Sequence, residues 1–189
     1  MLLGVRLAFP DPPLSAGGFV LRRMTPGDIG WIAATCNDRE LSRYVPGIPY
    51  PYSEADAHAY AEYAARGWSE GSGATFVIAG EPGGQGLGMI ELHLFGGDPG
   101  LAEVGYWLGP PARGRGAATT AVRLVAGWAF GELGIGRLNL QTAPENRASQ
   151  RVAERAGFTR EGLLRAWLPT ADGRRDSLMF SLLAGDPRR

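Results

Sequence analysis

Apolar residues fall into short runs along this chain, and most of the runs have the spacing of strands. In residues 137–142 the apolar side chains of Leu138 and Leu140 alternate with polar ones, whereas residues 101–108 are nearly continuously apolar. Alternation indicates a half-buried strand, and a short continuous run between turn residues is consistent with a fully buried one. The predicted strands cover residues 19–23, 74–79, 87–95, 101–108, 137–142, 158–168 and 174–183.

Helix-start signals mark several segments between these strands. Thr25 precedes Pro26 and lies three residues before Asp28, and Ser53 lies three residues before Asp56. A Ser or Thr N-cap satisfies free amides of the first turn, Pro fits the first helical position, and the acid bonds back to the cap. The predicted helices cover residues 26–36, 39–44, 53–66, 119–133 and 146–156.

The order of these elements predicts an α/β fold in which helices cover a mixed sheet. Residues 1–17, with Pro10, Pro12 and Pro13, are expected to form an extended lead-in, and residues 18–189 a single domain. The 189 residues, 44% of them hydrophobic, suffice for one full-sized core. No internal repeat or linker composition divides the chain.

A glycine-rich turn joins the strand at 101–108 to the helix that follows. Its sequence is Arg113-Gly114-Arg115-Gly116-Ala117-Ala118. The first amides of a helix have no intrahelical partner, and the positive end of the helix dipole lies behind them. Gly114 and Gly116 let a ligand approach the backbone closely, and the two alanines keep the wall of the site low. The turn is therefore predicted to bind a phosphate group.

Two common nucleotide-binding motifs do not fit this turn. A P-loop needs a Lys followed by Ser or Thr, whereas all 19 basic residues of this chain are Arg. A dinucleotide fingerprint needs a third glycine where this chain has Thr119, and it normally opens the first βα unit rather than lying past mid-chain. The phosphate must therefore belong to another kind of ligand.

Further motifs surround the turn in a recognisable order. Residues 103–108 read Glu-Val-Gly-Tyr-Trp-Leu before it, and Asn146 and Ser149 open a later helix that ends at Gly157-Phe158. With residues 113–118 as the motif Q/R-x-x-G-x-G/A, the arrangement resembles the GNAT superfamily of N-acetyltransferases. Within it, the closest resemblance is to the branch of ribosomal-protein N-terminal acetyltransferases. It implies a mostly antiparallel mixed sheet with helices on both faces, whose parallel central strands splay apart.

The resemblance also implies that acetyl-coenzyme A is the acyl donor, used in a ternary complex with no metal and no covalent acyl-enzyme. The pyrophosphate is expected on the backbone amides of residues 114–118, with both arginines of the turn as candidate phosphate partners. The pantetheine arm is expected along residues 101–108, where backbone N–H groups near Trp107 and Leu108 would polarise the thioester carbonyl. Asn146 is expected to cap its helix, to contact the pantetheine arm, or to do both.

Candidate catalytic residues follow from the same resemblance. Ser149, one turn into its helix, is the candidate general acid for the thiolate, although a Ser there also caps helices or faces solvent. A base is needed because a free amine is mostly protonated at pH 7. Glu103 is the first candidate for that base, and Glu91 and His93, on one face of the preceding strand, come next. Each of these three side chains is also compatible with an outward position on a half-exposed strand.

The acceptor is expected to be a small-molecule amine or a protein N-terminus. In the family, the first third of the chain, here residues 38–66, lines the acceptor groove. Five tyrosines of this chain cluster there, namely Tyr44, Tyr50, Tyr52, Tyr60 and Tyr63. The net charge is zero, which gives no overall electrostatic reason to expect nucleic-acid or membrane binding.

Composition adds expectations about compartment and leaves two alternative functions open. The single Cys36 cannot form an internal disulfide and fits a reducing cytoplasm, and neither a signal peptide nor an apolar run of about 20 residues is evident. A homodimer is expected only as a family trait. The first alternative function uses succinyl-coenzyme A or another acyl donor. The second is a catalytically silent domain that binds acyl-coenzyme A.

Overall fold

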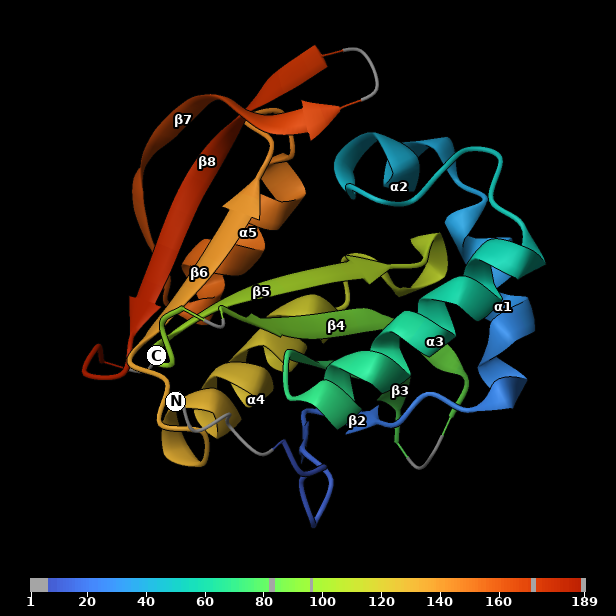
Figure 1. Cartoon of the computed structure of the whole chain (residues 1–189), viewed down its shortest axis with the longest axis horizontal. Coiled ribbons are helices and arrows are strands. Elements are labelled where there is room, and N and C mark those ends of the chain that lie inside the picture. Colours follow the sequence, from blue (N-terminus) through green and yellow to red (C-terminus); the bar gives the residue numbers. More distant parts are fainter. Residues whose placement is uncertain (1–6, 82–83, 96, 171–172, 188–189) are drawn as a thin grey trace.

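The computed structural model describes residues 7–81, 84–95, 97–170 and 173–187, which form an eight-stranded sheet with helices against it (Figure 1). The strands are β1 (Ser15–Ala16), β2 (Phe19–Arg22), β3 (Gly73–Gly80), β4 (Gly86–Leu94), β5 (Leu101–Leu108), β6 (Arg137–Thr142), β7 (Thr159–Thr170) and β8 (Gly173–Leu183). The helices are α1 (Ile29–Cys36), α2 (Arg39–Tyr44), α3 (Glu54–Glu70), α4 (Ala117–Gly131) and α5 (Arg147–Ala156), with 3₁₀ turns η1 (Pro26–Asp28) and η2 (Pro110–Ala112).

The sheet confirms the predicted mixed and mostly antiparallel architecture. Its strands lie in the order β1-β2-β3-β4-β5-β6-β8-β7, and among the described strands only the pair β5 and β6 is parallel. That pair is in register over Leu101–Glu103 and Arg137–Asn139, after which the two strands separate. Figure 1 shows them diverging like the arms of a V. The predicted splay is therefore present, at the strand that leads to the glycine-rich turn.

Two hydrophobic cores hold helices on opposite faces of the sheet. One core joins Phe76, Ile90 and Val104 of the sheet to α4 and α5. The other joins Met89 and Trp107 to α1 and α3. Side chains alternate between the faces along a strand, so even-numbered positions of β4 and β5 face α4 and odd-numbered ones face α3. Whether a residue number in β4 or β5 is even or odd therefore decides which face of the sheet its side chain occupies.

The described part of the predicted lead-in contributes to the fold. Ser15–Ala16 form β1, which pairs with β2, and Leu7, Phe9 and Leu14 pack against the larger core. The ring centroid of Phe9 lies 5.5 Å from that of Phe76. Residues 1–6 lie outside the described residues. The pattern of prolines predicted an extended segment but gave no sign that its apolar side chains join the core.

Most predicted boundaries agree with the structure within a few residues, and the differences have local causes. The capping box of Ser53 and Asp56 is present. The helix after Thr25 begins at Ile29 because residues 26–28 form a 3₁₀ turn. Helix α3 continues past the predicted end at residue 66 to Glu70, because Trp68 still packs against the core. Residues 171–172 of the predicted hairpin turn lie outside the described residues.

Candidate active site

The glycine-rich turn has the backbone geometry of an anion site. Gly114 and Gly116 have φ values of 75° and 85°, a left-handed conformation that favours glycine, and a Cβ at either would meet nothing within 4 Å. Gly116 is the N-cap of the 15-residue helix α4, so that helix directs its first free amides toward open space. The buried Ala117 and Ala118 follow. The turn therefore offers an unobstructed cradle for a phosphate.

The two arginines of the turn have different surroundings. Arg113 donates to Glu40 Oε2 at 2.5 Å, to Asp38 Oδ2 at 3.0 Å and to the carbonyl of Leu108 at 3.2 Å. It therefore ties the turn to the N-terminus of α2, and a phosphate would compete with two carboxylates for it. The guanidinium of Arg115 has no hydrogen-bond or ion-pair partner among the described residues. Of the two predicted phosphate partners, Arg115 is thus the one that is not already engaged.

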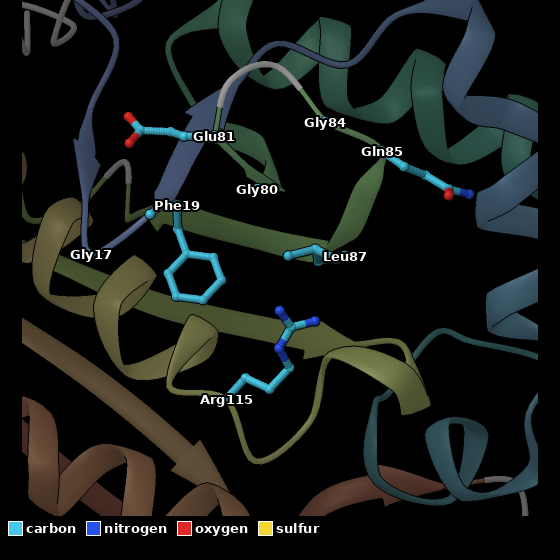
Figure 2. A pocket seen from close by; sticks show the side chains of 9 residues that line it. Gly17, Phe19, Gly80, Glu81, Gly84, Gln85, Leu87 and Arg115 are labelled. Carbon is cyan, nitrogen blue, oxygen red and sulfur yellow. The ribbon is translucent and has the colours of Figure 1, made fainter.

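Arg115 points into a hollow beside the turn (Figure 2). The hollow has a volume of about 460 Å³ and lies between the β1–β2 turn, the β3–β4 connection and the glycine-rich turn. Figure 2 shows the ring of Phe19 and the side chain of Leu87 directed toward the same space as the guanidinium. Glycines form much of the remaining wall, among them Gly17, Gly80 and Gly84. The hollow adjoins the predicted phosphate site but carries only this one described cation.

The splay leaves part of β5 without a neighbour on its β6 side. Residues 104–108 pair with β4 on one side, but register with β6 ends at Glu103. Unpaired N–H and C=O groups at such an edge are available to an extended ligand. Trp107 and Leu108 lie at the end of this segment, and Gly109 and the 3₁₀ turn η2 connect it to the glycine-rich turn. An extended ligand that carries phosphates would follow the edge and then reach the turn.

Ser149 lies at the N-terminus of α5, on the α4 side of the sheet. Its Oγ is 2.8 Å from the hydroxyl of Tyr106, which belongs to β5, so the α5 terminus is fixed against the splayed strand. Asn146 Oδ1 accepts from the amide of Ser149 at 3.0 Å, which establishes the predicted N-cap. The amide nitrogen of the Asn146 side chain has no partner among the described residues. Burial raises the pKa of Tyr106 to about 12, so its phenol remains protonated near neutral pH.

The three candidate bases lie together on the opposite face, toward α3. His93 of β4 is directly across from Glu103 of β5, and its Nε2 is 3.1 Å from Glu91 Oε2. Helix α3 covers this group with two tyrosines: Tyr60 donates to Glu91 Oε1, and the Tyr63 hydroxyl is 3.3 Å from His93 Nδ1. Residues 91, 93 and 103 thus form one acid–imidazole cluster, which we call the base cluster.

The base cluster contains a histidine with a raised pKa and has a glycine beside it. The hydrogen bond that His93 donates to Glu91 raises the pKa of His93 above its ordinary value, against the effect of burial. Glu103 accepts from Gln141 Nε2 at 2.8 Å, across the start of the splay. Gly105 follows Glu103 on the same face, and a Cβ there would lie 4.0 Å from His93 Nε2. The absence of a side chain at 105 leaves a notch next to the cluster.

The sequence missed the side-chain partners that organise the site. The sequence pattern indicated no side-chain role for Tyr106, whose hydroxyl contacts that of the candidate acid, and it predicted Tyr60 and Tyr63 only as members of the tyrosine cluster in residues 38–66. The alternation of β5 gave a signal for Tyr106, because position 106 must face α5 rather than α3. Within the described residues, no group of three or more His, Cys, Asp and Glu side chains is placed to hold a metal ion. None of the described helices has the length and apolar character required to span a membrane.

Comparison with known proteins identifies the family. The domain described as "Acetyltransferase (GNAT) domain" matches residues 19–159, which is most of the chain. The chain belongs to the GNAT acetyltransferase family, as predicted from the sequence.

Particular relatives refine this placement. Over 96 residues the chain is 38% identical to "Putative ribosomal N-acetyltransferase YdaF" of Bacillus subtilis (strain 168), covering 51% of this chain and 52% of that protein. The match thus spans about half the length of this curated relative, whose name supports the predicted ribosomal-protein branch.

Solved structures agree with the fold. A GNAT-family acetyltransferase from Bacillus anthracis has a TM-score of 0.82 at 21% identity, over 92% of this chain and 99% of that one. RimJ of Mycobacterium smegmatis, solved in complex with CoA-disulfide, has a TM-score of 0.79 at 22% identity, over 88% of this chain and 82% of that one. At such identities these structures establish the fold alone.

Proposed function

We propose that this protein transfers the acetyl group of acetyl-coenzyme A to a primary amine by direct attack in a ternary complex. The observation that carries the proposal is the arrangement around β5. The base cluster lies on one face of this strand, and Ser149 with Tyr106 lies on the other. The unpaired edge of residues 104–108 lies between them and leads to the glycine-rich turn. An amine and a thioester that meet in the splay would then have a base and an acid on opposite sides.

The donor site is assigned to the backbone of the turn and of β5. The amides of residues 114–118 hold the pyrophosphate, and Arg115 adds a cation that no described side chain neutralises. The unpaired edge of β5 binds the pantetheine arm, with backbone N–H groups near Trp107 and Leu108 donating to the thioester carbonyl. Asn146 donates to the arm through its side-chain nitrogen, since its oxygen is already used as the N-cap.

The base cluster prepares the acceptor. Glu103, first in line as general base, removes a proton from the ammonium group directly or through a water molecule, and Glu91 with His93 forms the alternative base. The notch at Gly105 admits the amine to this face of β5. The nitrogen lone pair forms the C–N bond as the C–S bond breaks.

Ser149 assists the departure of the thiolate. The Tyr106 and Ser149 hydroxyls are 2.8 Å apart, and either can be the donor. In the proposed step Tyr106 is the donor, which leaves the serine hydrogen free for the sulfur, where the helix dipole of α5 supports the developing charge. Ser149 gives its proton to the sulfur and is reprotonated by one of the two protons that the nitrogen loses, while the base releases the other to solvent, so that the products are the amide, the free thiol and one proton. A thioester is already activated, so positioning supplies much of the catalysis.

The proposal also includes the acyl group of the donor and the class of acceptor. The acetyl donor is preferred to a succinyl donor, which would need a cation for its distal carboxylate. A protein N-terminus or a small-molecule amine is the acceptor, in keeping with the ribosomal N-acetyltransferase named above. A cytoplasmic location and a homodimer stay predictions.

Two variants separate donor binding from chemistry. Gly116→Val places a side chain in the left-handed cradle and should abolish binding of acetyl-coenzyme A in calorimetry. Ser149→Ala should bind acetyl-coenzyme A with affinity close to wild type but lower kcat by about 10²-fold or more. Circular dichroism melts provide the control for folding of both variants.

The two results are independent. Unchanged affinity in a folded Gly116→Val variant would remove the phosphate assignment. An unaltered turnover rate in Ser149→Ala would remove Ser149 as the acid while leaving the donor site in place.

A further inference from the structure

Helix α2 crosses the open end of the splay and is attached to both of its arms. At its N-terminus, Asp38 and Glu40 bind Arg113 of the turn that follows β5. At its C-terminus, the carbonyl of Arg43 accepts from Arg175 Nη1 of β8 at 3.3 Å. Figure 1 shows α2 facing the end of β7 and the start of β8. An acceptor that reaches the base cluster from this end must pass α2 and β8.

Arginines without acidic partners line this entrance. Arg39 and Arg43 lie one turn apart on α2 and stack over the exposed Tyr50 and over Tyr44, respectively, and Arg175 is exposed on β8. We call Arg39, Arg43 and Arg175 the arginine rim. Among the described residues, none of the three has a carboxylate within 4.0 Å.

The neighbouring acids are already engaged. Asp38 and Glu40 are paired with Arg113, and Asp176 accepts from the amide of Ala166 at 2.7 Å. A hydrogen bond to an amide leaves the charge of Asp176 in place, so Arg113 and the arginine rim together carry four positive charges against these three carboxylates, and the group has a net positive charge.

The other end of this face, at the base cluster, carries acidic side chains. Glu91 and Glu103 lie there, with His93 as the one titratable cation among the described residues of the base cluster. Strand register gives the separation between the two ends. Arg175 lies six residues along β8 from Ser181, which opposes Asn139, the parallel neighbour of Glu103. Six residues of strand span about 20 Å.

This charge distribution selects among amine acceptors. The positive charge of an amine near Glu91 and Glu103 is attracted by these acids. A part of the same acceptor that lies about 20 Å away is next to the positively charged arginine rim. A polyamine carries positive charge along its whole length and would be repelled there. We propose that the acceptor is the amino terminus of a peptide segment with acidic side chains about four to six residues after the reacting amine. The inference rests on the proposed acetyl transfer and names its substrate class.

Matched peptides test the proposal directly. Thiol release from acetyl-coenzyme A is measured with Ala-Ser-Gly-Gly-Glu-Glu-Gly amide, with the same peptide carrying Gln-Gln or Arg-Arg at positions 5 and 6, and with Glu-Glu moved to positions 2 and 3. At low salt the first peptide should exceed the Gln peptide in kcat/KM about fivefold to tenfold, and the advantage should shrink in 0.5 M salt. The Arg peptide and the shifted peptide should be the poorer substrates.

Variants then locate the effect. In Arg43→Gln/Arg175→Gln, the Glu and Gln peptides should become equivalent, with the Gln peptide little changed. Arg160→Gln is the matched control, because this exposed arginine lies on β7 opposite Phe180, away from the hairpin tip. It should retain the full preference for the Glu peptide.

The outcomes distinguish a failure of this inference from a failure of the proposed acetyl transfer on which it rests. Thiol release with equal rates for the Glu, Gln and Arg peptides overturns the acidic acceptor but leaves acetyl transfer intact. Failure of every amine, peptides and small molecules alike, overturns the proposed function. Competition by a single-stranded RNA oligonucleotide that depends on the arginine rim, without discrimination among peptides, would assign the rim to nucleic acid instead.

Discussion

At the scale of single residues, the base cluster concentrates three titratable groups on one face of the splay. Glu91 accepts from Tyr60 and contacts His93, whereas Glu103 has Gln141 as its partner. The carboxylate of Glu91 is thus engaged by two side chains, and it raises the pKa of His93. Glu103 lies at the last paired position before β5 and β6 separate, which places it at the start of the splay.

The pH dependence of turnover separates these bases. Glu103→Gln should lower kcat by about 10²-fold or more and displace the rising alkaline limb of the kcat profile, because the group that accepts the proton is lost. Glu91→Gln is the matched isosteric control and should cost less. The pKa of His93 should fall in this variant, since His93 loses the carboxylate that raises it, while the limb set by Glu103 should keep its position. A Glu103→Gln profile identical to wild type would transfer the role of base to Glu91 and His93.

At the scale of elements, one side chain from a distant part of the chain binds both acids at the N-terminus of α2, whose Leu41 is buried in the second core. Arg113 reaches back to Asp38 and Glu40, and its Nε also binds the carbonyl at the end of β5. Helix α2 has only six residues, too few to be stable in isolation. Its position over the splay therefore depends on these tertiary contacts.

Replacing Arg113 should loosen α2 specifically. In Arg113→Gln, amide hydrogen exchange of residues 39–44 should become faster, with a loss of unfolding free energy of about 1 kcal/mol or less because the ion pairs are partly exposed. Arg115→Gln is the matched control, since Arg115 has no partner among the described residues. Equal exchange of α2 in both variants and in wild type would show that Arg113 does not hold the helix.

Local pattern predicted the elements well, and it failed where distant residues meet. The bounds of β5 and β6 agree with the predicted 101–108 and 137–142. These strands could be predicted because the apolar pattern of their own residues indicates a strand. Helix α4 begins at Ala117 rather than at 119, because Gly116 already provides a left-handed N-cap. Arg113 and Glu40 are separated by 73 residues, and Tyr106 and Ser149 by 43. Such pairings depend on the order of the strands and the placement of the helices. The spacing of apolar residues within one segment cannot predict either of them.

At the scale of the whole molecule, the splay divides the sheet into two parts that share one functional opening. Strands β1 to β5 form one arm, and β6, β8 and β7 form the other. In the proposed function, the α4 side would provide the acid and the donor turn, whereas the α3 side would provide the bases and the entrance for the acceptor. The same opening in the sheet therefore accounts for the donor edge, the separation of acid and base, and the route of the amine.

Thiol release measured against a panel of amines and peptides, with acetyl- and succinyl-coenzyme A supplied in parallel, tests the central claim most directly. The account predicts thiol release that depends on the amine, is faster with the acetyl donor, and yields an equal amount of acetylated amine by mass spectrometry. Tight calorimetric binding of acetyl-coenzyme A without release for any amine, or a clear preference for the succinyl donor, would contradict it.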